Sequence, residues 1–247
     1  MERFGLVVPA YNEEETIQIC LNHLQSFRAA GDRIIVVDAG SSDATGEKAE
    51  RDGVEIVRAE TPARGWAAAA GVNELLKTGE RFEAILIVHA DTLLPPDARQ
   101  KLMEALQANP FCAGGSFGHR IEGSGWKFRL LEWGNRLRAK HWQIPYGDQA
   151  QFFRPDKLTS VGGFPNQEAM EDMELSLRMR RTGGAIYLDC PALIPRRHWK
   201  KGVARTTLRN WRKALAYIWK RSVATLPHKI AGEEIAANAG KSNHQAK

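Results

Sequence analysis

Residues 33–43 of the chain read RIIVVDAGSSD, and this stretch decides the fold. Four apolar residues in a row, Ile34 to Val37, are typical of a strand that is buried on both faces, as the strands of a parallel sheet are. The next residues, Asp38 to Asp43, are rich in glycine, serine and aspartate, which indicates a loop that leads into a helix. A buried strand followed by a polar loop and a helix is the repeating unit of an α/β fold.

The same unit recurs on both sides of this stretch. Strands are predicted at residues 4–9, 54–57 and 84–89, and helices at residues 14–30, 65–77 and 96–108. This alternation predicts right-handed crossovers and a doubly wound, mostly parallel sheet. Ligands bind such sheets beyond the carboxyl ends of the strands. Three expected strand ends carry polar residues there, at 9–12, 38–40 and 89–91.

The pattern changes after Ala113, where short strands, glycines and aromatic residues are expected instead. A strand at 150–153, a helix at 168–181, a strand at 185–189 and a long basic helix at 203–221 complete the prediction. The sequence has no Gly-x-Gly-x-x-Gly and no Gly-x-x-x-x-Gly-Lys loop. Both absences argue against a dinucleotide oxidoreductase and a P-loop NTPase.

Composition indicates a soluble α/β protein of ordinary kind. The 247 residues are 43% hydrophobic, enough for one large domain with a core, and no run of eighteen apolar residues could span a bilayer. The N-terminus reads as a first strand rather than as a signal peptide. Three scattered cysteines, Cys20, Cys112 and Cys190, indicate buried, reduced thiols in a cytoplasmic protein.

Positive charge is concentrated near the C-terminus. The net charge is +6, and no Asp or Glu interrupts the segment from Arg196 to Lys229. Such a block favours an anionic partner, whether phosphate groups, an acidic membrane surface or nucleic acid. Trp211 and Trp219 lie among these cations at helical spacing, as in helices that lie on membranes. Alternatively, the apolar stripe packs on the domain and the charges are solvated.

Two motifs, VPAYNEE at residues 8–14 and VVDAGSSD at residues 36–43, resemble the opening of family-two glycosyltransferases, which have the GT-A fold. Later motifs follow in that family's order: HAD at 89–91, GDQ at 147–149, GGF at 162–164 and ED at 171–172. The resemblance covers roughly residues 4–200.

The resemblance implies a single GT-A domain over residues 1–200, with a mixed, mostly parallel sheet flanked by helices. Residues 1–110 would form its nucleotide-binding half and residues 111–200 its acceptor and catalytic half. A basic amphipathic helical extension is expected at 201–232 and a disordered tail at 233–247.

For the donor, the resemblance implies that Asp38 accepts a hydrogen bond from the base or ribose, beside Pro9, Tyr11 and Glu13. Asp38 could equally be a turn or capping residue. Arg64, at the start of a helix, suits an anion such as the donor diphosphate, although surface arginines are common.

The HAD motif stands where the family has Asp-x-Asp, so the resemblance implies a divalent cation, Mg²⁺ or Mn²⁺, on Asp91. His89 replaces the first aspartate and would contact the nucleotide or favour Mn²⁺; it could also be a histidine satisfied at a strand end. We expect Arg196 and Arg197 to clamp the leaving diphosphate, with His198 as a further phosphate or metal ligand. This segment could instead be simply the start of the basic block.

Likeness to the family points to Asp172, in the Glu171-Asp172 pair, as the catalytic base. Helical geometry would place Glu171, Glu174, Arg178 and Arg181 on one solvated, ion-paired stripe. Asp172 falls on a less polar side, or all these acids merely favour the first turn of a helix. In similar enzymes the GDQ segment lines the acceptor side, so Gly147, Asp148 and Gln149 are expected to bind the substrate.

The predicted function is inverting transfer of a sugar from a nucleoside-diphosphate sugar to the hydroxyl of a small or lipid-linked acceptor. The alternatives are a nucleotidyltransferase, or a catalytically silent protein that binds nucleotide sugars or nucleic acid. The acidic, glycine-free run at residues 10–15 disfavours the first, and the lack of a nucleic-acid motif disfavours specific nucleic-acid binding. The expected location is the cytoplasm, with peripheral contact at the inner face of the membrane.

Overall fold

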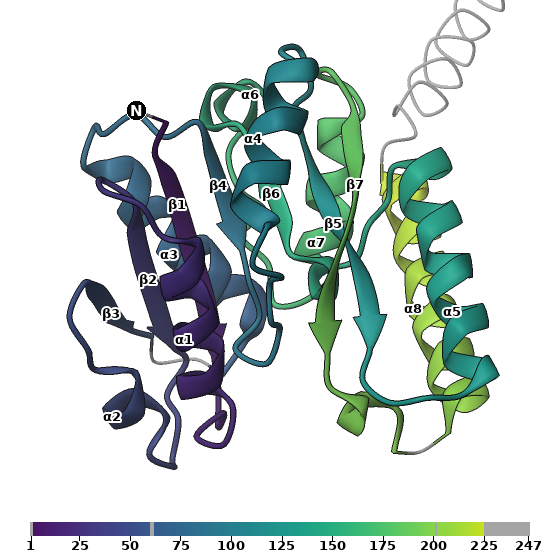
Figure 1. The fold of residues 1–247 in the computed structure, drawn as a ribbon. Helices are drawn as coiled ribbons and strands as arrows, with labels where there is room; N and C mark the ends of the chain where they lie inside the picture. Colours follow the sequence, from purple (N-terminus) through teal and green to yellow (C-terminus); the bar gives the residue numbers. More distant parts are fainter. Residues whose placement is uncertain (1, 60–61, 201, 225–247) are drawn as a thin grey trace, which may run out of the picture. The chain divides into compact units, whose positions relative to one another are not determined.

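The computed structural model describes residues 2–59, 62–200 and 202–224 of the chain (Figure 1). The chain divides into two compact units, Met1–Val203 and Ala204–Lys247. The first unit is built on a seven-stranded sheet with the strand order β3-β2-β1-β4-β6-β5-β7. The strands are β1 (Phe4–Ala10), β2 (Arg33–Asp38), β3 (Val54–Arg58), β4 (Ala84–Ile87), β5 (Gly114–Ile121), β6 (Gln151–Phe153) and β7 (Ala185–Ile194).

The first four strands are parallel, as their sequence pattern predicts, because a helix follows each of β1, β2 and β3 and returns the chain to the same end of the sheet. β6 breaks the pattern and runs antiparallel to both β4 and β5, while β5 and β7 pair in parallel. The sheet is therefore mixed and mostly parallel, which confirms the predicted fold class. The carboxyl ends of β1, β2 and β4 meet at one edge.

Helices cover both faces of the sheet (Figure 1). On one face, α1 (Ile17–Phe27) and α4 (Ala98–Ala108) bury Leu21, Leu24 and Leu102 against alternate residues of β1, β2 and β4. On the other, α3 (Arg64–Lys77), α6 (Pro155–Ser160) and α7 (Glu171–Met179) contribute to a second core. Alternation along each strand sends successive side chains into opposite cores, which gives the three layers.

Helix α6 was not predicted, and three other helices differ from the prediction for a clear reason. α1 begins at Ile17 rather than Glu14, because the Glu13 carbonyl accepts from the amides of Thr16 and Ile17 in a turn. α7 begins at Glu171 rather than Glu168, because Met170 adopts a left-handed φ of 64° that a helix cannot include. The third, α5 (Trp126–Leu137), was missed, since its tryptophans and its glycine favoured short strands.

The remaining elements are short. They are α2 (Thr45–Ala49), the π-helical turn η1 (Arg138–Trp142) and the 3₁₀ turns η2 (Gly147–Gln149) and η3 (Arg196–Trp199). Cys20, Cys112 and Cys190 are buried and unpaired, as expected from their spacing.

The second unit contains α8 (Val203–Ala224), close to the predicted basic helix. Its apolar residues Leu208, Trp211, Leu215 and Trp219 are exposed. The predicted tail, 233–247, and the end of the predicted extension, 225–232, lie outside the described residues. Among the helices described, none is both long enough and apolar enough to cross a lipid bilayer.

Candidate functional site

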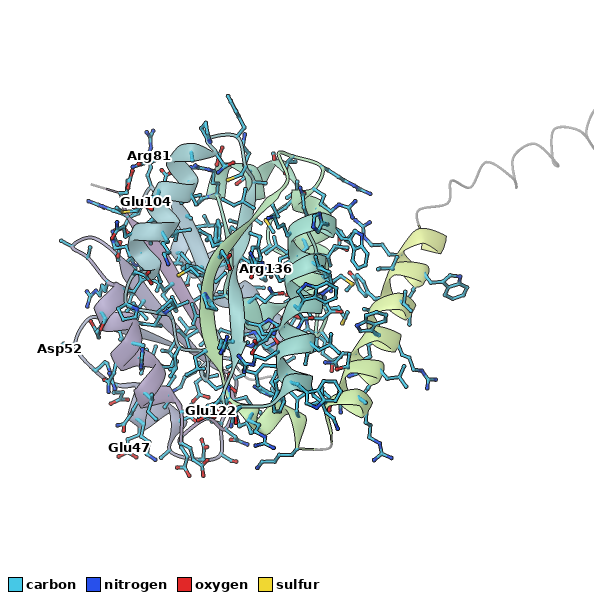
Figure 2. All side chains as sticks on the ribbon, turned by 45° about the vertical axis from the view of Figure 1, so that its right-hand side comes forward. Glu47, Asp52, Arg81, Glu104, Glu122 and Arg136 are labelled. Carbon is cyan, nitrogen blue, oxygen red and sulfur yellow. The ribbon has the colours of Figure 1, made fainter. Side chains whose placement is uncertain are left out.

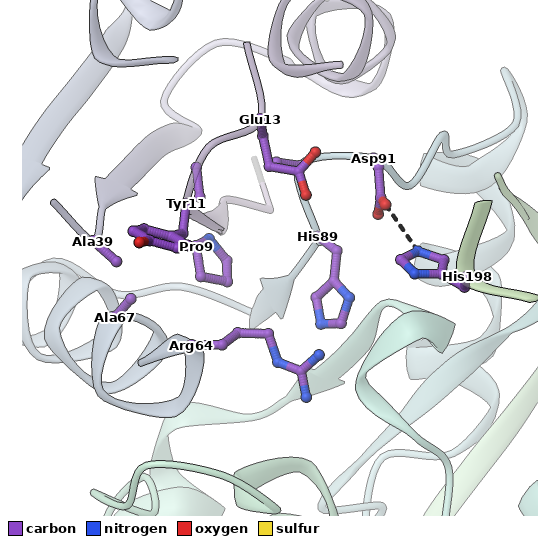
Figure 3. A pocket seen from close by; sticks show the side chains of 11 residues that line it. Pro9, Tyr11, Glu13, Ala39, Arg64, Ala67, His89, Asp91 and His198 are labelled. Carbon is purple, nitrogen blue, oxygen red and sulfur yellow. Dashed lines mark ion pairs between the residues drawn. The ribbon is translucent and has the colours of Figure 1, made fainter. Parts of the chain in front are cut away.

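A cavity opens at the edge of the sheet where β1, β2 and β4 end (Figure 3). Four segments bring side chains to it: the end of β1, the residue after β2, the first turn of α3 and the loop after β4, with η3 closing one side. The residues lining it are Pro9, Ala10, Tyr11, Glu13, Ala39, Arg64, Ala67, His89, Ala90, Asp91 and His198. Most of the predicted donor and metal residues therefore share one cavity.

Asp91 is the most heavily bonded acid of the cavity. Its Oδ2 lies 2.8 Å from His198 Nε2 and accepts hydrogen bonds from Arg197 Nη2 at 2.6 Å and Nε at 3.2 Å. Burial by itself would raise the pKa of Asp91, but the bonds from His198 and Arg197 outweigh it and hold that pKa well below its usual range. Asp91 is thus a permanent anion at the end of β4.

Arg197 joins two of the segments. Its Nη2 also pairs with Glu13, so one guanidinium links the loop after β1 to the loop after β4. Arg196, its neighbour, does not reach the cavity: its guanidinium lies over the Phe128 ring, 5.4 Å from the centroid. Of the two arginines predicted to clamp the diphosphate, Arg197 contacts Asp91 in the cavity and Arg196 packs on Phe128, so the role of Arg196 stays a prediction.

His89 is held neutral. Burial lowers its pKa to about 4, and the nearby Arg64 guanidinium acts in the same direction. A neutral imidazole keeps one nitrogen free to accept a hydrogen bond or to bind a metal. His89 also marks the boundary of the cavity with the acceptor half, since a Cβ on Gly147 would lie only 2.9 Å from its Nε2.

Asp172 lies close to the same glycine. The Gly147 amide donates to Asp172 Oδ2 at 2.7 Å, and a Cβ on Gly147 would lie 3.3 Å from that oxygen. The Met173 amide donates to Oδ1, also at 2.7 Å. Both carboxylate oxygens are therefore fixed in direction. Asp172 and His89 both border the position that a Cβ on Gly147 would take, so a larger residue at 147 would have to displace one of them.

Glu171, in contrast, points toward α3. It is 4% exposed, and its Oε1 accepts from Arg64 Nε at 3.1 Å. Burial raises the pKa of Glu171, the Arg64 charge opposes that rise and the neighbouring Asp172 adds to it. The close approach depends on Gly65, where a Cβ would lie 2.1 Å from the Gln167 carbonyl oxygen.

The solvated stripe predicted for this helix is therefore wrong for Glu171 and for Glu174, which is 8% exposed. The i,i+4 pair of Glu174 with Arg178 does form, at 2.9 Å, and Arg181 is exposed. Helical periodicity correctly grouped these side chains but could not reveal that α3 covers part of the group.

Asp38 does not itself line the cavity, although the next residue, Ala39, does. Its Oδ1 accepts from the Ser41 amide at 2.9 Å, and a Cβ on Gly46 would lie 2.9 Å from its Oδ2. The side chain thus supports the loop after β2, the alternative that the sequence left open. Tyr11, 47% exposed, lies beside this loop and lines the cavity.

The GDQ segment divides into an internal and an accessible part. Gln149 is 1% exposed; its Oε1 accepts from Arg138 Nη2 and from the Tyr146 amide, both at 3.1 Å. The side-chain amide of Gln149 is hydrogen-bonded inside the fold, so the prediction that Gln149 faces the substrate is wrong. Asp148 remains half-buried, and its Oδ1 has no hydrogen-bond partner among the described residues.

Sequence reasoning missed two buried residues that hold this segment. Arg138 stacks on the Tyr146 ring, 3.4 Å from its centroid, and donates to the Ile144 carbonyl at 2.6 Å. Gln151 Nε2 donates to the carbonyls of Pro145 and Asp172, both at 3.1 Å, and so ties the loop to α7. Neither residue belongs to a motif. Their role in holding the loop is apparent only from the hydrogen bonds that their side chains form in the structure.

The residues present fit a divalent cation only in part. Two cis ligands at about 2.1 Å from an octahedral ion lie about 3 Å apart, and Asp91 Oδ2 and His198 Nε2, at 2.8 Å, have this spacing. Within the described chain, no cluster of three or more His, Cys, Asp or Glu side chains could hold a metal alone. A cation at Asp91 would thus need other ligands, as donor phosphates and water can supply.

The sequence of the chain matches a known protein family. The model for glycosyl transferase family 2 matches residues 6–164. The chain belongs to glycosyl transferase family 2. The family predicted from the sequence is confirmed, and with it the assignment of the chain to the glycosyltransferases. Among curated proteins, none matches the chain at a significant level.

Solved structures with the same fold include two glycosyltransferases. S. aureus TarS 1–349 in complex with UDP-GlcNAc aligns with a TM-score of 0.61 and 18% identity, over 79% of this chain and 59% of that one. The mannosyltransferase PcManGT from Pyrobaculum calidifontis, in complex with GDP-Man and Mn²⁺, aligns with a TM-score of 0.61 and 20% identity, over 98% of this chain and 81% of that one. This chain thus spans about 60% of the TarS fragment. At these identities the likeness shows the fold, which is GT-A as predicted.

Proposed function

We propose that the chain transfers a sugar from a nucleoside-diphosphate sugar to an acceptor hydroxyl, with inversion at the anomeric carbon. Family membership supports a glycosyltransferase. One observation carries the proposal: His89 lines the cavity together with Asp91, and it also borders Gly147, where a Cβ would lie 2.9 Å from His89 Nε2 and 3.3 Å from Asp172 Oδ2. A donor diphosphate and an acceptor hydroxyl could therefore be held within one site.

The donor would lie in the cavity between β1 and β4. Pro9, Tyr11, Glu13 and Ala39 form the wall that suits the nucleoside, with Asp38 supporting the loop from behind. Arg64 and Arg197 supply cationic groups for the two phosphates. TarS with UDP-GlcNAc and PcManGT with GDP-Man are relatives in fold that bind donors of this class.

Asp91 and His198 are the residues that would hold a divalent cation, Mg²⁺ or Mn²⁺, and His89 would complete that side of the cavity as a neutral imidazole. A cation bound there would neutralise charge on the departing diphosphate. PcManGT is described with Mn²⁺, which agrees with this assignment. Arg197 contacts the same oxygen, Asp91 Oδ2, as His198 does. Its guanidinium would therefore lie beside the cation and would also stabilise the negative charge of the departing diphosphate.

Asp172 is assigned as the base. The acceptor oxygen attacks the anomeric carbon from the side opposite the diphosphate, the bond from that carbon to the diphosphate oxygen breaks, and the diphosphate leaves with the electron pair. The hydroxyl proton passes to Asp172, whose oxygens are aimed by the amides of Gly147 and Met173. Asp148, which is half-buried, is proposed to bind the acceptor. Its Oδ1 is enclosed and lacks a partner among the described residues, so the side chain would have to turn to reach an acceptor hydroxyl. Glu171 positions Arg64 rather than taking the proton.

Two further parts of the proposal concern partners. The acceptor is a small or lipid-linked hydroxyl compound, and the basic helix α8, with Trp211 and Trp219 exposed, is proposed to contact the inner face of a membrane. A nucleotidyltransferase is disfavoured by the acidic loop after β1, where Glu13 pairs with Arg197.

The test is a donor screen. UDP-, GDP- and dTDP-sugars are incubated with the chain with Mn²⁺, with Mg²⁺ and with a chelator, and release of the nucleoside diphosphate is measured. Release from at least one donor is expected, and proton NMR of freshly formed product should show the anomeric configuration opposite to that of the donor. Retained configuration would contradict the inverting mechanism. Thermal stabilisation by oligonucleotides, without stabilisation by any nucleoside diphosphate, would instead support the nucleic-acid alternative.

A further inference from the structure

α5 carries an apolar stripe that its own unit leaves exposed. Trp126 is 71% exposed, Leu130 56% and Trp133 59%. These residues are spaced i, i+4 and i+7, so at 3.6 residues per turn they form one line along the helix, about 10 Å long. Exposed leucines occur singly on most proteins, but two tryptophans and a leucine in line on one helix are a contiguous patch.

The opposite side of α5 is anchored, which fixes the stripe outward. Phe128 is 6% exposed and meets the Trp199 ring edge-on, with 6.2 Å between the centroids. Glu132 accepts from the Ile121 amide at 2.7 Å and pairs with Arg129 at 2.9 Å. Because these contacts all belong to one face, rotation of the helix cannot bury the tryptophans.

Basic side chains border the stripe. Lys127 lies on one side of it, with Nζ 5.7 Å from the centroid of the Trp126 ring. Arg136, which Figure 2 labels, follows on the other side of the helix and forms an ion pair with Asp189 at 2.7 Å. Lys140, His141 and Trp142, in the turn η1 that continues α5, are exposed as well. Glu132 is the sole acid between residues 126 and 142, and it is paired with Arg129. The surface is therefore both apolar and cationic.

We propose that this face of α5 is a docking surface for an anionic lipid bilayer. Trp126, Leu130 and Trp133 enter the interface between headgroups and acyl chains, where the amphipathic indole ring is favoured. Lys127 and Lys140 meet the anionic headgroups, and each such residue contributes about 1 kcal/mol near a charged membrane. Exposed indole rings beside lysines favour an anionic bilayer over a protein partner, because indole rings concentrate at the membrane interface.

A bilayer bound to this face of α5 would lie near the part of the site that is assigned to the acceptor. α5 runs directly into Arg138, whose contacts to Ile144, Tyr146 and Gln149 lie on both sides of Gly147, the residue that donates to Asp172. On the proposed function, this places the bilayer beside the loop assigned to the acceptor, as a lipid-linked acceptor would require. The docking surface itself does not depend on that function.

The test is flotation of the full chain with vesicles of phosphatidylcholine alone and of phosphatidylcholine mixed with phosphatidylserine. Binding is expected to the mixed vesicles only. Replacing both Trp126→Ser and Trp133→Ser should weaken it about tenfold or more, since apolar burial drives interfacial binding. Phe111→Ser, which removes an aromatic that is 80% exposed elsewhere, is the matched control and should bind as the parent does. Lys127→Gln should weaken binding about fivefold, the equivalent of about 1 kcal/mol, and the exposed Arg81→Gln should not.

Four outcomes would overturn the proposal: no binding to mixed vesicles, equal binding to neutral ones, full binding by the tryptophan variant, or self-association in solution that this variant abolishes. The pair Trp211→Ser and Trp219→Ser separates α8 from α5. If it alone removes binding and the α5 variant keeps it, the docking surface lies in the second unit. Release of nucleoside diphosphate by the α5 variant, measured without lipid, should equal that of the parent, so failure of docking is distinguishable from failure of the proposed function.

Discussion

Asp91 and Glu171 are two carboxylates of one site that are almost equally buried, at 7% and 4% exposed, yet the structure perturbs them in opposite directions. Asp91 receives hydrogen bonds from both Arg197 and His198, and its pKa falls. Glu171 has one bond from Arg64, a half-exposed residue, and a second carboxylate next to it, and its pKa rises.

The difference shows that burial alone does not decide the charge of an acid in this protein. Desolvation raises the pKa of both groups, and the number of charged donors facing each oxygen determines whether the rise survives. The first corner, around Asp91, stays anionic, and on the proposed function it receives a cation. The second corner, around Glu171, has a raised carboxyl pKa that the Arg64 charge only partly opposes.

The largest effect is expected from removing the anion of the first corner. Asp91→Asn leaves His198 and Arg197 without their common acceptor, so transfer should fall by about three orders of magnitude, and stabilisation of the protein by Mn²⁺ with a nucleoside diphosphate should disappear. Transfer rates and melting temperatures with and without Mn²⁺ measure both. Asp156→Asn, at an exposed acid outside the site, is the control. Unchanged Mn²⁺ dependence would remove Asp91 from the cation site.

A second substitution breaks the boundary between the corners. In Gly147→Ala the new Cβ would lie 2.9 Å from His89 Nε2 and 3.3 Å from Asp172 Oδ2, so the two groups must move apart. Because small misplacements of reacting groups are costly, transfer should fall about 100-fold. Gly134→Ala on α5, where nothing lies within 4 Å of the added atom, should leave the rate unchanged. Equal rates for the two variants would mean that the contact is irrelevant to turnover.

Arg64→Gln tests the single cation of the second corner. Glu171 would lose its ion pair, and the pKa of Glu171 should rise further because burial and Asp172 are no longer opposed. Since Arg64 also faces the cavity, we expect donor binding to weaken about tenfold. The exposed Arg181→Gln is the matched control. Calorimetric titration with the donor found in the screen measures the change, and parental affinity would count against Arg64 as a diphosphate ligand.

The smallest effects concern stability, and they should have opposite signs at the two corners. Asp91 has a lowered pKa, so its stabilisation is present above the unfolded value of about 3.8 and is lost as the pH falls through the folded value. Glu171 has a raised pKa, so it costs stability once the pH rises above about 4.5 and through its folded value. Therefore, as the pH rises from 2 to 4, Asp91→Asn should become less stable relative to the parent, and as the pH rises from 4 to 8, Glu171→Gln should become more stable relative to the parent.

Melting temperatures across this pH range provide the measurement. About 1 kcal/mol corresponds to about 2–4 °C for a domain of this size, so shifts of a few degrees are expected. If both variants changed in the same direction with pH, the contrast between the corners would be lost.

The first half of the fold could be predicted because its information is local. Buried runs such as Ile34 to Val37 and polar strand ends such as Asp91 are visible in the sequence, and parallel strands bring such ends together. The second half depends on contacts over long separations. The Gln149 side chain is hydrogen-bonded to Arg138, and Glu171 is hydrogen-bonded to Arg64. Arg196 packs on the Phe128 ring. The periodicity of the sequence does not reveal any of these partners.

α5 shows a second limit of prediction from sequence. Its tryptophans favoured a strand interpretation because bulky aromatics are common in strands, and the helix became recognisable only with its anchored face. The stripe that misled the prediction is the same surface from which we infer docking to a bilayer.

The central claim, that Asp172 takes the proton while the corner around Asp91 holds the donor, is tested most directly by Asp172→Asn. Donor affinity and transfer rate should be measured on the same preparation. Because the amide turns an N–H toward one of the two backbone amides that Asp172 now accepts, the melting temperature should be recorded as well. We predict donor binding within about twofold of the parent and transfer reduced by about 100- to 10,000-fold, the usual contribution of a general base. Transfer at the parental rate by a folded, donor-binding variant would contradict the assignment.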